Sequence, residues 1–200
     1  MNTYDKRVEI KYLIDEHEMR AIYKHLQIFG TVDTHANNCG EYCVNSIYLM
    51  SWCSRARTGK NHGRLRIRHY VNNNQIFLEE KIKVRDLSKK VRYAISEEES
   101  NIIRGFTSTD QMINFINNKG LQFSLPLMWI PTWDGGEVTY NRKAFVAAHD
   151  GLMYRATIDH GLSSKEQPLL PNQYILELKT TQEFEALVKY FLDKFDILPT

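Results

Sequence analysis

Charged and apolar residues alternate along several segments of the chain, a pattern typical of β-strands with two different faces. In residues 64–70 three arginines are separated by Leu65 and Ile67, so a strand places the guanidinium groups on one face and the aliphatic side chains on the other. Residues 77–85 alternate in the same way. The asparagines at 72–74 lie between these segments and are a turn signal. The pattern therefore predicts an antiparallel hairpin.

The same alternation recurs in other parts of the chain, in residues 7–12, 46–50, 90–92, 138–142, 155–159 and 176–179. A strand with one apolar and one charged face normally shows its charges to water. Here, however, most charged faces mix Arg or Lys with Glu or Asp, as the polar lumen of a closed barrel requires. We therefore predict an α+β protein built on an antiparallel β-tunnel of about eight strands, a closed barrel with a charged lumen. A solvated sheet is the alternative.

Amphipathic helices are expected between and after the strands. Asp15 with Glu18, and Ser96 with Glu99, have the spacing of a capping box ahead of apolar residues at helical spacing. Further helices are expected from Thr109 until Gly120 and from Thr181 onward. Their apolar stripes are predicted to pack against the outside of the barrel.

One segment in the middle of the chain is predicted to be a loop. Residues 125–136 contain two prolines and Asp134-Gly135-Gly136, which are turn signals. Trp129 and Trp133 within it are expected to pack in the core, with stacking on a nucleobase as the alternative. Since no repeat or change of composition marks a boundary, residues 1–200 are predicted to be a single domain.

Composition excludes several classes of protein. With 200 residues, 42% hydrophobic and 25% charged, the chain resembles an ordinary soluble globule rather than a disordered, collagen-like or coiled-coil protein. It has no apolar run of membrane-spanning length and no signal-peptide core, which favours a cytoplasmic location. Cys39, Cys43 and Cys53 lack the spacing of a zinc knuckle or a redox pair, so free thiols are expected.

The charge of the chain is unevenly distributed. The net charge is +2, but residues 55–93 contain twelve Lys or Arg and only three acids, and the rest of the chain is acidic. Such a block is either a solvated face or a site for a polyanion. A cation-rich lumen would suit a polyanion, and a few carboxylates within it could hold a divalent metal.

The alternating segments, taken in their order along the chain, resemble the motifs of a known catalytic domain. This is the domain of the vacuolar transporter chaperone (VTC) polyphosphate polymerases, which belong to the triphosphate tunnel metalloenzymes of the CYTH-like superfamily. The resemblance extends over nearly the whole chain. The matching motifs are Arg7 to Tyr12, Ser46-Ile47-Tyr48, Arg66 to Tyr70, Leu78-Glu79-Glu80-Lys81, Lys90-Val91-Arg92, Tyr140-Asn141-Arg142, Arg155 to Asp159 and Leu176-Glu177-Leu178-Lys179.

This resemblance implies a polymerase that transfers the γ-phosphoryl group of ATP to inorganic polyphosphate with the help of Mn²⁺ or Mg²⁺. The residues expected to act most directly on the transferred phosphate are Arg66, Arg68, Lys81 and Arg142. Residues expected to hold other phosphates are Lys11, Arg64, Lys83, Lys90, Arg92, Tyr140, Arg155 and Lys179. Glu177, with Glu9 as a second candidate, is expected to bind the metal. Alternatively, these carboxylates, like Glu79 and Asp159, only neutralise neighbouring cations.

The sequence departs from the family pattern in two places. Met50 replaces an acidic residue, and the chain ends at Leu198-Pro199-Thr200 where the family usually continues to a lysine. The missing lysine makes a non-catalytic polyphosphate-binding module one alternative. A hydrolase of tripolyphosphate or nucleoside triphosphates is another, because related tunnels cleave such substrates, although Arg7 in place of the first glutamate of their Glu-x-Glu-x-Lys strand favours the polymerase. The expected partners are ATP and polyphosphate or triphosphate, with a separate membrane partner possible and no nucleic acid.

Overall fold

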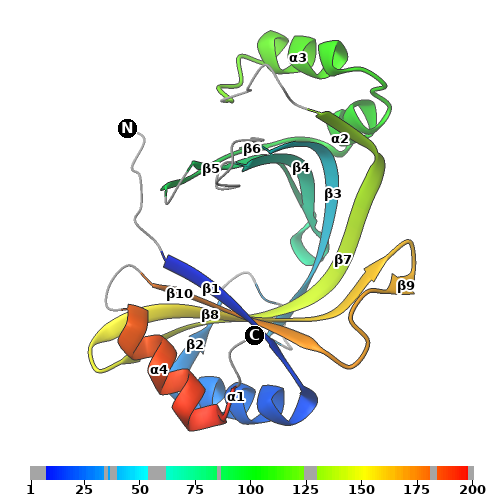
Figure 1. Cartoon of the computed structure of the whole chain (residues 1–200). Helices are drawn as coiled ribbons and strands as arrows, with labels where there is room; N and C mark the ends of the chain where they lie inside the picture. The colour runs from blue at the N-terminus through cyan, green and yellow to red at the C-terminus, as the bar shows by residue number, and fades with distance from the viewer. Residues whose placement is uncertain are drawn as a thin grey trace. The chain divides into compact units, whose positions relative to one another are not determined.

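The computed structural model describes residues 8–33, 36, 40–53, 62–84, 87–123, 130–180 and 184–197 (Figure 1). Within these residues the strands form one sheet in the order β1-β10-β8-β7-β3-β4-β5-β6, with β2 paired to β7 and β9 paired to β8. Every strand pair with a defined register is antiparallel. The predicted α+β class and antiparallel sheet are thus confirmed.

The elements follow one another along the chain as β1 (Val8–Ile14), α1 (Glu16–Phe29), β2 (Gly30–Val32), β3 (Glu41–Cys53), β4 (His62–Tyr70), η1 (Val71–Asn73), β5 (Gln75–Val84), β6 (Leu87–Ala94), α2 (Glu97–Arg104), α3 (Thr109–Asn118), β7 (Ile130–His149), β8 (Leu152–Ser164), β9 (Gln167–Pro168), β10 (Tyr174–Thr180) and α4 (Phe184–Phe195).

Three helices begin with reciprocal capping boxes. Asp15 caps α1 together with Glu18, and Ser96 caps α2 together with Glu99, as predicted. The third cap is Ser108 with Gln111, and α3 begins directly after it at Thr109, as expected. Each box satisfies backbone N–H groups that would otherwise have no partner at the helix start. The predicted start of α4 at Thr181 lies outside the described residues.

The chain divides into two compact units. Unit 1 contains residues 45–138, and unit 2 contains the described residues up to 44 and from 139 onward. β3 and β7 contribute residues to both units. The single domain over residues 1–200 stays a prediction.

Unit 1 has its core on the apolar face of β4 and β5. Leu65, Ile67 and Leu78 are almost fully buried and pack with Ile103 of α2 and Met112 of α3. The predicted hairpin is present, with Asn74 in the left-handed conformation at φ 51° before β5. Glu80 is an exception to the alternation, because this charged residue lies on the apolar face of β5. Glu80 is 1% exposed.

Unit 2 has an equivalent core under β1, β10 and β8. Ile158, Leu176 and Leu178 are fully buried and pack with Ile22 of α1 and Phe191 of α4. Figure 1 shows α1 and α4 together on one side of these strands. The apolar faces of the alternating segments are therefore covered by helices, as predicted.

The predicted loop over residues 125–136 is wrong for its second half, because β7 begins at Ile130. β7 pairs with β3, and the Asn45 amide donates to a Glu137 carboxylate oxygen at 2.6 Å between the two strands. Pairing with a neighbouring strand overrides the local turn preference of Asp134-Gly135-Gly136. The side chains of Trp129 and Trp133 lie outside the described residues, as does Cys39, whereas Cys43 is a free thiol.

The pairing of β7 with β8 contains a bulge. Thr139 is opposite Ser163, but Asn141 is opposite His160, so two residues of β8 face the single residue Tyr140. Gly161 occupies the bulge with φ 62°, a left-handed conformation that favours glycine. None of the helices in the described part of the chain has the length and hydrophobicity needed to cross a lipid bilayer.

We expect Ile158→Ala to reduce the free energy of unfolding by roughly 2–5 kcal/mol, because it leaves a cavity in the core of unit 2. Met153→Ala on the same strand, where the side chain is 57% exposed, is the control and should change it by no more than about 0.5 kcal/mol. Urea titration of both variants tests this; equal effects would contradict the assignment of the two faces of β8.

Candidate phosphate-binding and metal-binding site

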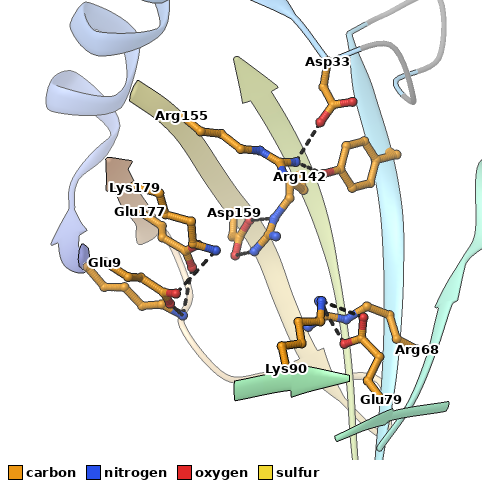
Figure 2. A network of polar contacts seen from close by, with 12 residues as sticks. Glu9, Asp33, Arg68, Glu79, Lys90, Arg142, Arg155, Asp159, Glu177 and Lys179 are labelled. Carbon is orange, nitrogen blue, oxygen red and sulfur yellow. Dashed lines mark hydrogen bonds and ion pairs between the residues drawn. The ribbon is translucent and has the colours of Figure 1, made fainter. Parts of the chain in front are cut away.

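Glu79 is the centre of a charged cluster in unit 1. Its side chain is 1% exposed and accepts from Arg66 Nε at 3.1 Å and Nη2 at 2.9 Å. Arg68 Nη1 lies 3.5 Å and Lys90 Nζ 2.8 Å from the same carboxylate. Pairing of β4, β5 and β6 thus places three cations around one carboxylate. Figure 2 shows two of them, Arg68 and Lys90, beside Glu79.

The surroundings of Glu79 hold it in the ionised form. Burial alone would raise the pKa of its carboxyl, but Arg68, Lys90 and Arg66 lower this pKa from the usual 4.5 to about 2. Burial lowers the pKa of Lys90 to about 8, although Glu79 opposes this change. The cluster keeps an excess of positive charge while all four groups are ionised.

More cations lie on the same face of β4, β5 and β6. Cross-strand register aligns Arg64 with Lys81 and Lys81 with Lys90, so like charges are directly opposite one another. The seven cations that share this face are Arg64, Arg66, Arg68, Lys81, Lys83, Lys90 and Arg92, and Glu79 is the single carboxylate among its described side chains. Such a face favours binding of a polyanion.

Aromatic and hydroxyl groups adjoin this face. The guanidinium carbons of Arg64 and Arg66 lie 5.9 and 5.8 Å from the centre of the Tyr48 ring. The Tyr48 pKa is lowered, because the positive charge of Arg66 and its neighbours outweighs the effect of burial. Arg68 Nε donates to the Ser46 hydroxyl at 3.4 Å. β3 therefore positions the arginines of β4.

In unit 2, Arg142 and Arg155 are paired with separate carboxylates. Arg142 donates to Asp159 through Nε at 2.5 Å and Nη2 at 2.6 Å, a bidentate contact between two buried side chains (Figure 2). Burial alone would lower the pKa of Arg142, but Asp159 raises it well above its usual value. The Arg142 guanidinium also lies 5.2 Å from the centre of the Tyr140 ring. Asp159 therefore fixes the orientation of Arg142.

Arg155 is held by the segment that follows β2. Its Nη2 donates to Asp33 Oδ2 at 2.7 Å and to the Tyr42 hydroxyl at 3.3 Å. The Arg155 side chain is 42% exposed, so the contact orients it while leaving surface accessible. Neither Asp33 nor Tyr42 was predicted, because no motif connects them with Arg155.

Two glutamates and two lysines form a closed ring of ion pairs on β1 and β10, which we call the Glu–Lys ring (Glu9, Lys11, Glu177 and Lys179). Lys11 Nζ lies 3.1 Å from Glu177 and 3.7 Å from Glu9. Lys179 Nζ lies 3.5 Å from Glu9 and also contacts Glu177. Burial would raise the pKa of Glu177, but Lys179, Lys11 and Arg142 lower it.

The donor atoms of the ring fit a divalent cation. Magnesium and manganese sites commonly use one or two carboxylates together with water and substrate phosphates. Thr157, directly opposite Glu177 on β8, is 2% exposed, and its hydroxyl has no hydrogen-bond partner among the described residues. Within the described ranges, no three His, Cys, Asp or Glu side chains gather into a metal site by themselves. A metal here would therefore use Glu177 and Glu9, with the Thr157 hydroxyl beside Glu177.

The predicted site residues divide between the units. Unit 1 contains the seven cations named above, and unit 2 contains Glu9, Lys11, Tyr140, Arg142, Arg155, Glu177 and Lys179. Within each unit the predicted residues lie on one face of neighbouring strands. Their roles stay predictions.

The model of the VTC domain family matches residues 6–128 of the chain. No curated protein sequence matches it.

Solved structures with the same fold cover nearly the whole chain. A Bacillus halodurans protein proposed to be an adenylate cyclase has 13% identity and a TM-score of 0.57 over 97% of this chain and 92% of its own. A Hippeastrum protein proposed to be an adenylyl cyclase, with a dominant triphosphatase activity, has 14% identity and a TM-score of 0.52 over 96% and 87%. A Pyrococcus horikoshii protein has 9% identity and a TM-score of 0.52 over 96% and 91%.

We expect Glu79→Gln to reduce the free energy of unfolding by roughly 3 kcal/mol at pH 7, because three cations lose their shared counter-charge. Since the pKa of Glu79 is lowered to about 2, its stabilising effect is full above pH 4.5 and is lost as the pH falls toward 2. The difference between wild type and variant should therefore shrink over that interval in urea titrations. Glu98→Gln on α2 is the control, and a difference that does not vary with pH would contradict the prediction.

Proposed function

The chain belongs to the VTC domain family, and from this membership we propose that it is a metal-dependent polyphosphate polymerase that uses ATP. The observation that supports the proposal most directly is the charged face of β4, β5 and β6, where seven cations accompany one buried carboxylate. Their mutual repulsion is relieved when a polyanion binds. A chain of phosphates has the required density of negative charge.

In the proposed reaction, a terminal oxygen of the polyphosphate attacks the γ-phosphorus of ATP. The bond between that phosphorus and its bridging oxygen breaks, ADP leaves with the electron pair, and the polyphosphate is longer by one phosphate. Phosphoryl transfer of this kind depends mainly on positioning and on stabilising charge at the phosphate oxygens.

The arginines are suited to this task because a guanidinium can hold two phosphate oxygens at once. Glu79 and Asp159 orient Arg66 and Arg142 before substrate binds. The residues proposed to act on the transferred phosphate are Arg66, Arg68, Lys81 and Arg142. Those proposed to hold the remaining phosphates are Lys11, Arg64, Lys83, Lys90, Arg92, Tyr140, Arg155 and Lys179.

Glu177 and Glu9 are proposed to hold the divalent cation. When bound, such a cation neutralises charge on the phosphate oxygens during transfer. The residues around it keep Glu177 ionised, since Lys179, Lys11 and Arg142 lower its pKa against the effect of burial.

A triphosphate hydrolase is the second candidate. The Hippeastrum protein with this fold has a dominant triphosphatase activity. Hydrolysis would use the same cations, with water in place of the polyphosphate oxygen as the attacking group. A module that binds polyphosphate without catalysing a reaction is the third candidate function.

Incubation with ATP and Mn²⁺ should give polyphosphate, and Lys81→Ala or Glu177→Ala should reduce the rate of chain growth by at least about tenfold. Lys189→Ala, on the exposed side of α4, is the matched lysine control and should retain the wild-type rate. Phosphate release from tripolyphosphate without chain growth would indicate the hydrolase. Tripolyphosphate binding with neither reaction would indicate the binding module.

The affinity for tripolyphosphate should fall by about tenfold as the pH rises through 8, because Lys90, with its pKa lowered to about 8, loses its charge. Lys90→Arg keeps the charge and should remove this step. Calorimetric titrations between pH 7 and 9.5 test the effect, and wild type and variant are compared at each pH because tripolyphosphate also titrates. An identical profile for both proteins would contradict the assignment.

A further inference from the structure

The Glu–Lys ring has as many positive as negative charges. Each lysine contacts both glutamates, and each glutamate contacts both lysines. This differs from the face of β4, β5 and β6, where one carboxylate is shared among several cations. The cations of the ring are therefore already neutralised by groups of the chain itself.

The carboxylates of the ring are also the proposed metal ligands. Lys11 and a divalent cation would both use oxygens of Glu177, and Lys179 and the cation would both use oxygens of Glu9. An oxygen that coordinates a divalent cation has less charge to share with an ammonium. Occupation of the glutamates by a cation therefore weakens their hold on the lysines.

The Thr157 hydroxyl is a second observation that points to a ligand at this place. It is buried beside Glu177 and has no hydrogen-bond partner in the described part of the chain. A buried hydroxyl without a partner costs free energy, and a bound cation with its water would supply the missing contact.

We infer that the Glu–Lys ring is a masked anion site, in which Glu9 and Glu177 neutralise Lys11 and Lys179 until a divalent cation takes up the carboxylate oxygens. This inference rests on the proposed function, because it assigns the metal and phosphate of that reaction to the ring. Divalent cation and polyphosphate then bind with positive coupling, and by linkage each strengthens the binding of the other.

The first test measures anion binding without metal. Glu9→Gln and Glu177→Gln remove the mask, so in EDTA each variant should bind tripolyphosphate about fivefold or more tightly than wild type. EDTA also avoids the complex that tripolyphosphate forms with metal in solution. Glu16→Gln on the exposed face of α1 is the matched control for a simple change of net charge. Glu9 is partly exposed, so its variant keeps the test valid where Glu177→Gln does not fold.

The second test measures Mn²⁺ binding without phosphate, by electron paramagnetic resonance. Lys179→Gln removes a competitor for the carboxylates and should raise the affinity for Mn²⁺, whereas Glu177→Gln should lower it. Thr157→Val should lower it as well, and Thr157→Ser, which keeps the hydroxyl, should not.

Unchanged or weaker tripolyphosphate binding by both glutamine variants in EDTA would overturn the inference, as would weaker Mn²⁺ binding by Lys179→Gln. These outcomes are distinct from failure of the proposed function, which is the absence of chain growth from ATP. A protein that makes no polyphosphate can still show an unmasked ring, and an active polymerase can fail both binding tests.

Discussion

Repulsion between like charges on one face of a β-sheet is the constraint on which both charged sites depend. Strand register places Arg64, Lys81 and Lys90 directly opposite one another, an arrangement that costs free energy without a counter-charge nearby. In unit 1 the buried carboxylate of Glu79 is the counter-charge for Arg66, Arg68 and Lys90. In unit 2 Arg142 and Arg155 have separate counter-charges, Asp159 for Arg142 and Asp33 for Arg155. The shared carboxylate of unit 1 leaves an excess of positive charge that can bind an anionic ligand, whereas the one-to-one pairs of unit 2 leave none.

The same alternation builds the cores. Leu78 and Glu79 are neighbours in sequence but lie on opposite faces of β5. Leu78 is fully buried against α2 and α3, and Glu79 forms ion pairs with the cations of the charged face. Leu176 and Glu177 have the same relation in unit 2. Because the apolar and charged side chains are fixed by one strand register, a shift of one residue would expose the core and bury the charges together. Stability and anion binding therefore depend on the same backbone hydrogen bonds.

Short-range patterns in the sequence predicted most of the fold. The period of two identified the faces of β4, β5, β8 and β10, and the capping boxes at Asp15 and Ser96 located two helix starts to the residue. Long-range pairing could not be predicted in the same way. The partner of Arg155 is 122 residues away in the chain, and the strand that includes Asp134-Gly135-Gly136 pairs with β3, which is distant in sequence. Local preferences contain no information on such contacts.

The extra residue in β8 at Gly161 changes which positions of that strand share a face. Up to Asp159 the odd-numbered residues lie on the charged face, but beyond the bulge Ser163 is opposite Thr139 and lies on the same face as His160. A simple count by twos from Arg155 would assign Ser163 to the wrong side. Comparison of this hairpin with other sequences of the family consequently needs a one-residue gap at 161–162 wherever a relative lacks the bulge, and without that gap the residues beyond it would be matched to positions of opposite orientation.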